Sequence, residues 1–205
     1  MAPQDLAGRL EKRMIRVFPG IRGLIFDCDG TLADTMPAHI RTWVETLKNH
    51  GVDCPVVFLE TLRGMPAEEI VVTLNKKFNL RLDPREVADE KDRMIFEELQ
   101  YVKAIEPVAA IARDYKEKVP MAVASGGTRV NVLRTLKAIG LSDFFHAVIT
   151  ADDHLKPKPN PDMFLESARI MGIKPELCQV FEDGDLGLEA AREAGMPAID
   201  VRPYL

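Results

Sequence analysis

Two carboxylates stand at the end of an apolar stretch near the start of the chain. Residues 21–26 (IRGLIF) are rich in β-forming side chains, and Asp27 and Asp29 follow them at once. Such a run predicts a short buried strand, central in a parallel sheet, and ligands bind at the carboxyl end of such strands. Side chains alternate along an extended chain, so both aspartates face one crevice while Cys28 points away as a small buried hydrophobe. Two carboxylates this close repel each other and ionise best beside a cation or a proton.

Two simpler interpretations of this stretch are disfavoured. A calcium-binding loop follows the pattern D-x-D-x-D-G, but here Gly30 comes directly after the second aspartate. A surface turn with two aspartates fits poorly with the apolar strand that leads into it. We therefore interpret Asp27 and Asp29 as residues that carry chemistry.

Two further loops hold polar groups at predicted strand ends. Ser125, Gly126 and Gly127 precede a predicted helix, and backbone N–H groups at a helix N-terminus can hold a phosphate. Small residues after a strand are usually only a turn, so this loop alone is weak support. Residues 156–162 (KPKPNPD) hold two lysines among three prolines, which suits a positioned charge. The alternative for that segment is a solvated basic turn.

An acidic cluster ends the next predicted strand. Glu182 and Asp183 close the run 179–183, and Asp185 follows. Clustered carboxylates suit Mg²⁺, which prefers oxygen ligands. We interpret Asp185 differently, as the N-cap of the helix that begins there.

Taken in chain order, these segments resemble the haloacid dehalogenase superfamily. Residues 27–31 (DCDGT) are similar to its D-x-D-G-T signature, Ser125 falls at its second motif and Lys158 at its third. Glu182 and Asp183 fall at the acidic fourth motif. The subgroup that the chain resembles most is that of the β-phosphoglucomutase-like sugar phosphatases, and within it the fructose-1-phosphatases.

The resemblance implies an α/β fold: a Rossmannoid parallel sheet with helices on both faces and a helical type 1 cap. The sequence pattern agrees, because helix and strand signals alternate after residue 106, whereas residues 36–102 show only helical spacing. We expect residues 1–35 and 103–205 to form the core domain and residues 36–102 the cap. Thr35 and Asp83 are candidate helix N-caps, each followed closely by a proline.

The resemblance also implies the chemistry. It predicts a Mg²⁺-dependent phosphoric monoester hydrolase in which Asp27 is the nucleophile and forms a phospho-aspartate. Asp29 would act as general acid and then as general base. Ser125 and Lys158 would hold the phosphoryl oxygens. The expected substrates are small phosphorylated metabolites, sugar phosphates such as fructose 1-phosphate.

The remaining expected contacts are also taken from the family pattern. Gly126 and Gly127 would bind the substrate phosphate through their backbone. Mg²⁺ would be held by the Asp27 carboxylate, the Asp29 backbone carbonyl and Asp183, with Glu182 close by. In the cap, His39 and Lys91 match polar positions that approach the active site in relatives, and either is equally compatible with a surface side chain.

Other activities remain open at this point. A β-phosphoglucomutase-type phosphomutase would share every core residue, but Ala67 stands where the mutases carry a cap arginine. A non-enzymatic relative should have lost at least one of the four residues Asp27, Asp29, Lys158 and Asp183. A dehalogenase would need neither Asp29 nor a Mg²⁺ cluster.

Composition narrows the class of protein. The 205-residue chain has a formal net charge of −5, which argues against electrostatic binding of nucleic acid. No apolar run is long enough to span a membrane. Its three scattered cysteines predict free thiols and the reducing cytoplasm. We expect the protein to be a monomer that binds a small phosphate ester. Residues 1–20 are expected to form a short amphipathic helix.

Overall fold

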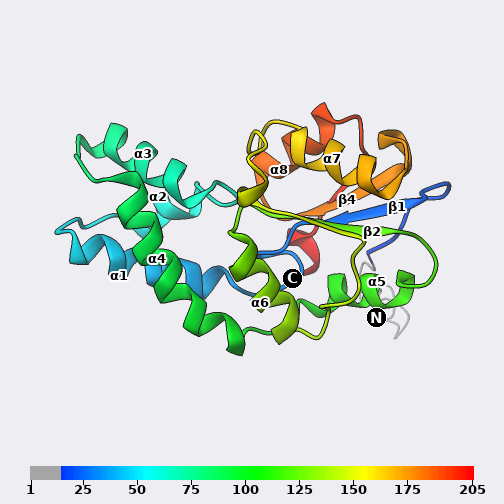
Figure 1. Ribbon diagram of the computed structural model, residues 1–205, viewed down its shortest axis with the longest axis horizontal. Coiled ribbons are helices and arrows are strands. Elements are labelled where there is room, and N and C mark those ends of the chain that lie inside the picture. Colours follow the sequence, from blue (N-terminus) through cyan, green and yellow to red (C-terminus); the bar gives the residue numbers. More distant parts are fainter. Residues whose placement is uncertain (1–14) are drawn as a thin grey trace, which may run out of the picture.

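The computed structural model describes residues 15–205, and a parallel five-stranded sheet lies at its centre (Figure 1). The strand order is β3-β2-β1-β4-β5, so the strand predicted to be central, β1, is the middle one. Residue Leu24 of β1 pairs in parallel with Met121 on one side and with Gln179 on the other. The strands are β1 (Gly23–Phe26), β2 (Met121–Ala124), β3 (Ala147–Ile149), β4 (Cys178–Glu182) and β5 (Ala198–Asp200).

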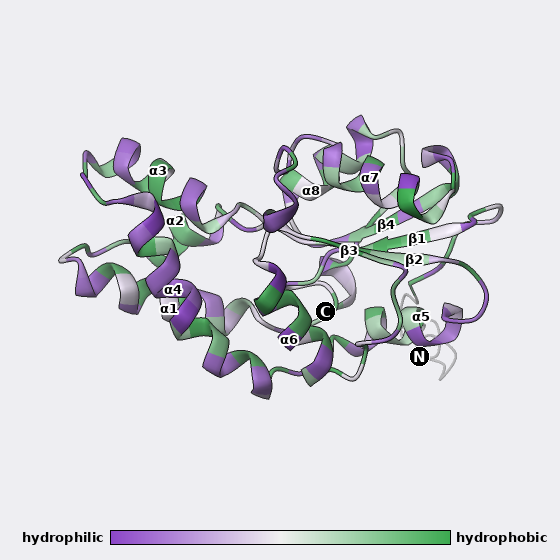
Figure 2. Cartoon of the chain, in the orientation of Figure 1, coloured by the Kyte–Doolittle hydropathy of each residue, from purple (hydrophilic) through white to green (hydrophobic). Residues whose placement is uncertain are grey.

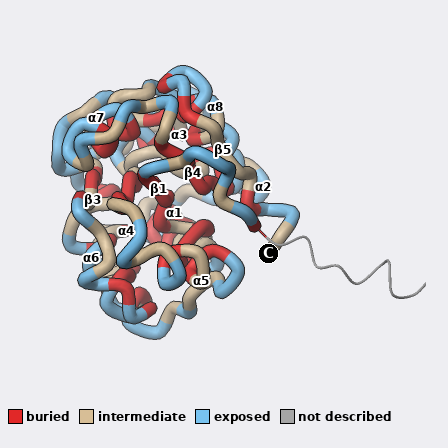
Figure 3. The backbone as a smooth tube through the Cα atoms, turned by 90° about the vertical axis from the view of Figure 1, so that its right-hand side faces the viewer, coloured by how far each residue is buried: buried red, intermediate tan, exposed pale blue. Residues whose placement is uncertain are grey.

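Helices cover both faces of the sheet, as the resemblance implied. Strands β1, β2 and β4 are buried along their whole length, because both of their faces are packed (Figures 2 and 3). On one face, Phe26 and Phe181 stack with their ring centroids 4.8 Å apart, against α5 and α6. On the other face, Ile25 and Val180 pack against α7 and α8. The four helices are α5 (Glu106–Tyr115), α6 (Arg129–Ala138), α7 (Asp162–Met171) and α8 (Asp185–Glu193).

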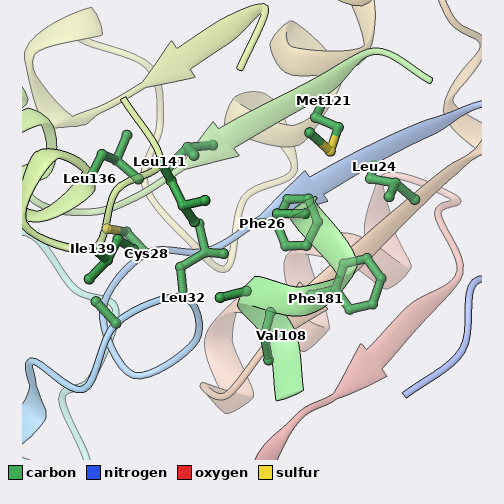
Figure 4. Close-up of a cluster of buried hydrophobic side chains, with 14 of the residues drawn as sticks. Leu24, Phe26, Cys28, Leu32, Val108, Met121, Leu136, Ile139, Leu141 and Phe181 are labelled. Atoms are coloured by element: carbon green, nitrogen blue, oxygen red, sulfur yellow. The ribbon is translucent and has the colours of Figure 1, made fainter. Parts of the chain in front are cut away.

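Cys28 is fully buried, as predicted, and this fixes where its neighbours point. Its side chain lies in the hydrophobic cluster with Leu32 and Ile139 (Figure 4). Because the residues on either side of it face the opposite way, the carboxylates of Asp27 and Asp29 are directed out of this cluster.

Residues 36–101, named here the helical segment, lie beside the sheet (Figure 1). The segment has its own core, in which Trp43, Leu47 and Leu74 are buried. Within it the structure places no strand. The division into a core domain and a cap at residues 35/36 and 102/103 stays a prediction. The helices are α1 (Met36–Asn49), α2 (Val56–Glu60), α3 (Ala67–Phe78) and α4 (Pro84–Glu98), followed by a 3₁₀ turn (Leu99–Tyr101).

Some local predictions are confirmed and others are wrong. Asp83 caps α4 by accepting hydrogen bonds from two backbone N–H groups. Asp185 does not cap α8: it is the first residue of that helix, and it forms an ion pair with Arg202 at 2.8 Å. Thr35 occupies the N-cap position of α1, as predicted, but its side chain makes no capping hydrogen bond. Short helix α2 has no counterpart in the sequence prediction.

The amphipathic helix expected over residues 1–20 lies mostly outside the described residues, and residues 15–20 are not helical. All three cysteines are free and buried. Nowhere in residues 15–205 does a helix combine the length and apolarity that a membrane span requires.

Candidate active site

The ends of three neighbouring strands bring the predicted site residues together. Asp27 directly follows β1, Ser125 directly follows β2, and Glu182 is the last residue of β4. Lys158 reaches the same place from the loop between β3 and α7, although it lies far away in sequence. A pocket of about 500 Å³ opens above them, and Trp43 and other residues of the helical segment form its opposite wall.

Lys158 joins two carboxylates at the floor of this pocket. Its Nζ donates to Asp27 Oδ1 and to Glu182 Oε2, each at 2.7 Å, and all three side chains are buried. Burial and the charge of Glu182 raise the pKa of Asp27 well above its usual range, although Lys158 opposes this. Burial lowers the pKa of Lys158, but the two carboxylates outweigh burial and the net pKa is raised. The lysine is therefore a firmly charged ammonium.

Asp27, Glu182 and Asp183 form a buried acidic cluster. Each offers one oxygen, and these oxygens lie within 4.8 Å of one another. Asp183 accepts a hydrogen bond from Thr31 Oγ1 at 2.9 Å, and the guanidinium of Arg63 lies 3.8 Å from its other oxygen. Burial, and then the charge of Glu182, raise the pKa of Asp183 to about 6. The cluster therefore carries more negative charge than its single lysine neutralises.

The carboxylate of Asp29 has different neighbours. It accepts hydrogen bonds from Thr35 Oγ1 at 2.8 Å and from Ser125 Oγ at 3.3 Å, and His39 Nε2 lies 3.3 Å away. Burial alone would raise the pKa of Asp29. The interaction with His39 and the hydrogen bond from Thr35 outweigh burial and lower this pKa to about 2. The two aspartates thus meet opposite electrostatic environments although only one residue separates them.

Lys91 and His39 are not independent surface residues. Lys91 is 4% exposed, its Nζ lies 2.9 Å from His39 Nδ1, and it also contacts Asp92 at 3.3 Å. Burial lowers the pKa of Lys91. The helical segment therefore reaches Asp29 through a chain of two side chains that starts on α4 and passes through α1.

The loop after β2 touches the helical segment. A Cβ atom at Gly126 would stand 2.6 Å from the carbonyl oxygen of Gly64, which lies between α2 and α3. Gly127 N–H donates to Ser125 Oγ at 3.1 Å. Gly126 therefore lets the backbone of the helical segment approach the strand ends closely.

Three residues beside the predicted site were missed by sequence reasoning. Thr31 belongs to the D-x-D-G-T stretch, but its contact with Asp183 depends on folding. Thr35 has the residue type and position of a helix cap, yet its hydroxyl donates to Asp29. Arg63 reaches Asp183 from a loop whose position is a tertiary property.

The geometry can be compared with known proteins. A sequence model of the haloacid dehalogenase-like hydrolases matches residues 24–201. The chain belongs to this family. This haloacid dehalogenase-like hydrolase is 38% identical over 180 residues to the fructose-1-phosphate phosphatase YqaB of Escherichia coli, covering 88% of the chain and 96% of that protein. It is 26% identical to the β-phosphoglucomutase of Bacillus subtilis, covering 88% of the chain and 83% of that protein.

A solved structure supports the fold. The β-phosphoglucomutase of Clostridium difficile superposes with a TM-score of 0.79 at 24% identity, covering 87% of this chain and 83% of that one. The predicted family, the α/β fold and the assignment as an enzyme, a phosphatase of the haloacid dehalogenase-like hydrolases, are thus confirmed.

Proposed function

We propose that the protein is a Mg²⁺-dependent phosphatase that hydrolyses phosphorylated sugars through a phospho-aspartate on Asp27. The observation that carries this proposal is the position of Lys158, which bridges the buried carboxylates of Asp27 and Glu182, while an oxygen of Asp183 lies within 4.8 Å of both. A buried carboxylate held in this way has a fixed direction of attack, and a cationic side chain stands where phosphoryl charge develops.

The acidic cluster fits a magnesium ion. Its donors are carboxylate oxygens, which Mg²⁺ prefers, and after burial the charge of Glu182 is the next cause that raises the pKa of both Asp27 and Asp183. Asp27 and Asp183 would hold the ion together with the Asp29 backbone carbonyl, and Glu182 would lie close by. A bound Mg²⁺ would offset the electrostatic repulsion between these carboxylates and an anionic substrate.

The chain's own residues then divide the reaction. Asp27 attacks phosphorus, so an O–P bond forms on its carboxylate while the bond to the sugar oxygen breaks. Asp29 passes a proton to the leaving alkoxide and takes one from the water that attacks the phospho-aspartate. Because the pKa of Asp29 is about 2, the proton for the first step arrives with the substrate, whose phosphate has a second pKa near 6. Ser125 and Lys158 hold the phosphoryl oxygens.

We propose that the helical segment acts as a cap that excludes water and selects the leaving group. Its separate hydrophobic core and the approach of Gly64 to Gly126 support this role. In this proposal His39 and Lys91 meet the leaving group, while Gly126 and Gly127 meet the phosphate. The boundaries at 35/36 and 102/103, the cytoplasmic location and the monomeric state stay predictions.

A phosphomutase is the second candidate, because relatives of that activity share the fold. A mutase must bind a bisphosphate and therefore needs a free cation far from Asp27. Among the described residues that line the pocket, the lysine and arginine side chains are Lys91 and Arg63, and both are already paired with acidic groups. This favours hydrolysis over mutase chemistry.

A panel of phosphorylated metabolites with Mg²⁺ tests the proposal, with released phosphate as the readout and Asp27→Asn as the inactive control. Fructose 1-phosphate is included because the E. coli relative carries that name. Phosphate release from sugar phosphates supports the proposal. If the protein instead isomerises a hexose 1-phosphate primed with a hexose bisphosphate, without net release of phosphate, the protein is a phosphomutase and the phosphatase proposal is wrong.

A further inference from the structure

Three buried polar atoms without partners lie along one face of α6. Within residues 15–205, the buried side-chain nitrogen and oxygen atoms that lack a hydrogen-bond partner are Thr128 Oγ1, Asn131 Oδ1 and Arg134 Nε. Their spacing of three residues places them on one side of the helix. Buried polar groups in proteins are nearly always paired, so a set of three in one stripe requires an explanation.

The stripe runs from the helical segment to the pocket. At its far end, Arg134 stacks on the ring of Phe96, 3.8 Å from the ring centroid, and lies 3.7 Å from Glu97. Arg134 therefore has a structural role against α4. Asn131 and Thr128, one and two turns closer to the strand ends, line the pocket instead.

We propose that Asn131, together with Thr128, binds a hydroxyl group of the leaving group and so determines specificity. The proposal rests on the proposed phosphatase function. Asn131 is 5% exposed, and its Oδ1 only accepts hydrogen bonds, so its partner must be a donor. Thr128 occupies the N-cap position of α6 but makes no capping hydrogen bond, which leaves its hydroxyl for a ligand.

The chemistry of these atoms restricts the ligand. An alkyl chain has no polar group and a phosphate carries at most one hydrogen, in its monoanion, whereas every sugar or polyol hydroxyl both donates and accepts. Asp92 lines the same pocket, so a second phosphate would also meet a carboxylate there. The substrate class is therefore a monophosphate whose leaving group carries a free hydroxyl on the α6 side.

Binding to the Asp27→Asn protein tests this without turnover. Calorimetry with fructose 1-phosphate and with hexyl phosphate, which has no hydroxyl, gives a ratio of two dissociation constants. In this background, Asn131→Leu is expected to weaken the binding of fructose 1-phosphate about tenfold relative to the binding of hexyl phosphate, because one hydrogen bond is lost. Thr135→Val is the matched control, because Thr135 is buried on α6 but does not line the pocket.

Each outcome decides the matter. A ratio that changes only in Asn131→Leu, or in Asn131→Ala if the leucine variant fails to fold, supports the assignment. An unchanged ratio, equal weakening of both ligands, or equal effects of the Thr135 control would overturn it, as would fructose 1-phosphate binding no better than hexyl phosphate. The proposed function is judged separately, by phosphate release from sugar phosphates by the unaltered protein.

Discussion

The ammonium of Lys91 lies 2.9 Å from Nδ1 of His39, and this contact determines how His39 faces Asp29. An ammonium group only donates hydrogen bonds, so Nδ1 must accept. The remaining ring nitrogen, Nε2, then carries the hydrogen in a neutral imidazole and donates it to Asp29, 3.3 Å away. A lysine on α4 thereby sets the tautomer of a histidine on α1.

This relationship predicts a selective loss of activity. His39→Ala and Lys91→Met should each lower kcat/KM for fructose 1-phosphate about 10–100-fold, but that for para-nitrophenyl phosphate only a few-fold, because in the proposed mechanism the helical segment meets the leaving group. Steady-state kinetics with both substrates provide the measurement. His50→Ala is the control, since His50 binds Glu90 at 2.8 Å on the same segment. Equal losses on both substrates would assign the pair to folding or closure.

The two aspartates should separate in rapid-mixing experiments. In the Asp29→Ala protein, Asp27 should still accept a phosphoryl group from an aryl phosphate, because an aryl leaving group departs with little help from an acid. Without a base for the second step, turnover should fall about 10²–10⁴-fold after a burst of phenol of at most one per active site. Asp27→Ala should give no burst. A normal burst from Asp27→Ala would show that the nucleophile is a different residue.

Asp183 should link metal binding, pH and stability. Its pKa of about 6 lies above the unfolded value near 3.9, so the folded state binds more protons between these values. Stability without metal should therefore fall as pH rises from about 4 to 6 and stay low above that range. At pH 7.5 in EDTA, Asp183→Asn should raise the free energy of unfolding by about 1–3 kcal/mol while weakening Mg²⁺ binding.

Urea unfolding in EDTA and in Mg²⁺ at pH 5 and 7.5 would measure both effects. Asp114→Asn, which removes an exposed charge on α5, serves as the control. If Asp183→Asn binds Mg²⁺ as tightly as the unaltered protein, the proposed metal site lies elsewhere.

Two glycine-to-alanine changes should act by different routes. At Gly30, φ is +85° and an added Cβ would collide with the Asp183 carboxylate, so Gly30→Ala should destabilise the protein by about 1–2 kcal/mol or more. Gly126 has an ordinary φ, but its added methyl would stand 2.6 Å from the backbone carbonyl oxygen of Gly64, so the helical segment must move away from the strand ends. Gly126→Ala should therefore raise KM for sugar phosphates as well as lower stability, whereas Gly30→Ala strains its own backbone. Thermal unfolding and kinetics distinguish the two, and an unchanged KM in Gly126→Ala would show that this contact does not position the helical segment.

Sequence patterns were sufficient for the sheet because each strand signal was local. The apolar run before Asp27 specifies β1, and the parallel arrangement follows from the alternation of strand and helix signals. These patterns singled out Asp27 and Asp29, whereas Ser125 and Lys158 were assigned to the site through the family resemblance. Their distances, and the opposite pKa shifts of Asp27 and Asp29, depend on side chains that are remote in sequence.

The missing capping hydrogen bonds of Asp185 and Thr35 share one physical cause. Asp185 and Thr35 are typical N-cap residues, but tertiary partners compete for their oxygens: Arg202 binds the first and Asp29 the second. Capping propensity describes local competition alone, and these sites lie where separate elements meet.

The place of the helical segment between β1 and β2 also bears on how the chain folds. All neighbouring strands are parallel, so none of them can pair as a local hairpin, and the first partner of β1 begins about a hundred residues later. Closing so long a loop carries a large entropic penalty, whereas the contacts among α1, α3 and α4 are closer in sequence. The helices between the two strands can thus collapse early and shorten the effective distance that the central pair must close. Folding would then be slow, and limited by the docking of β1 rather than by the formation of the helices.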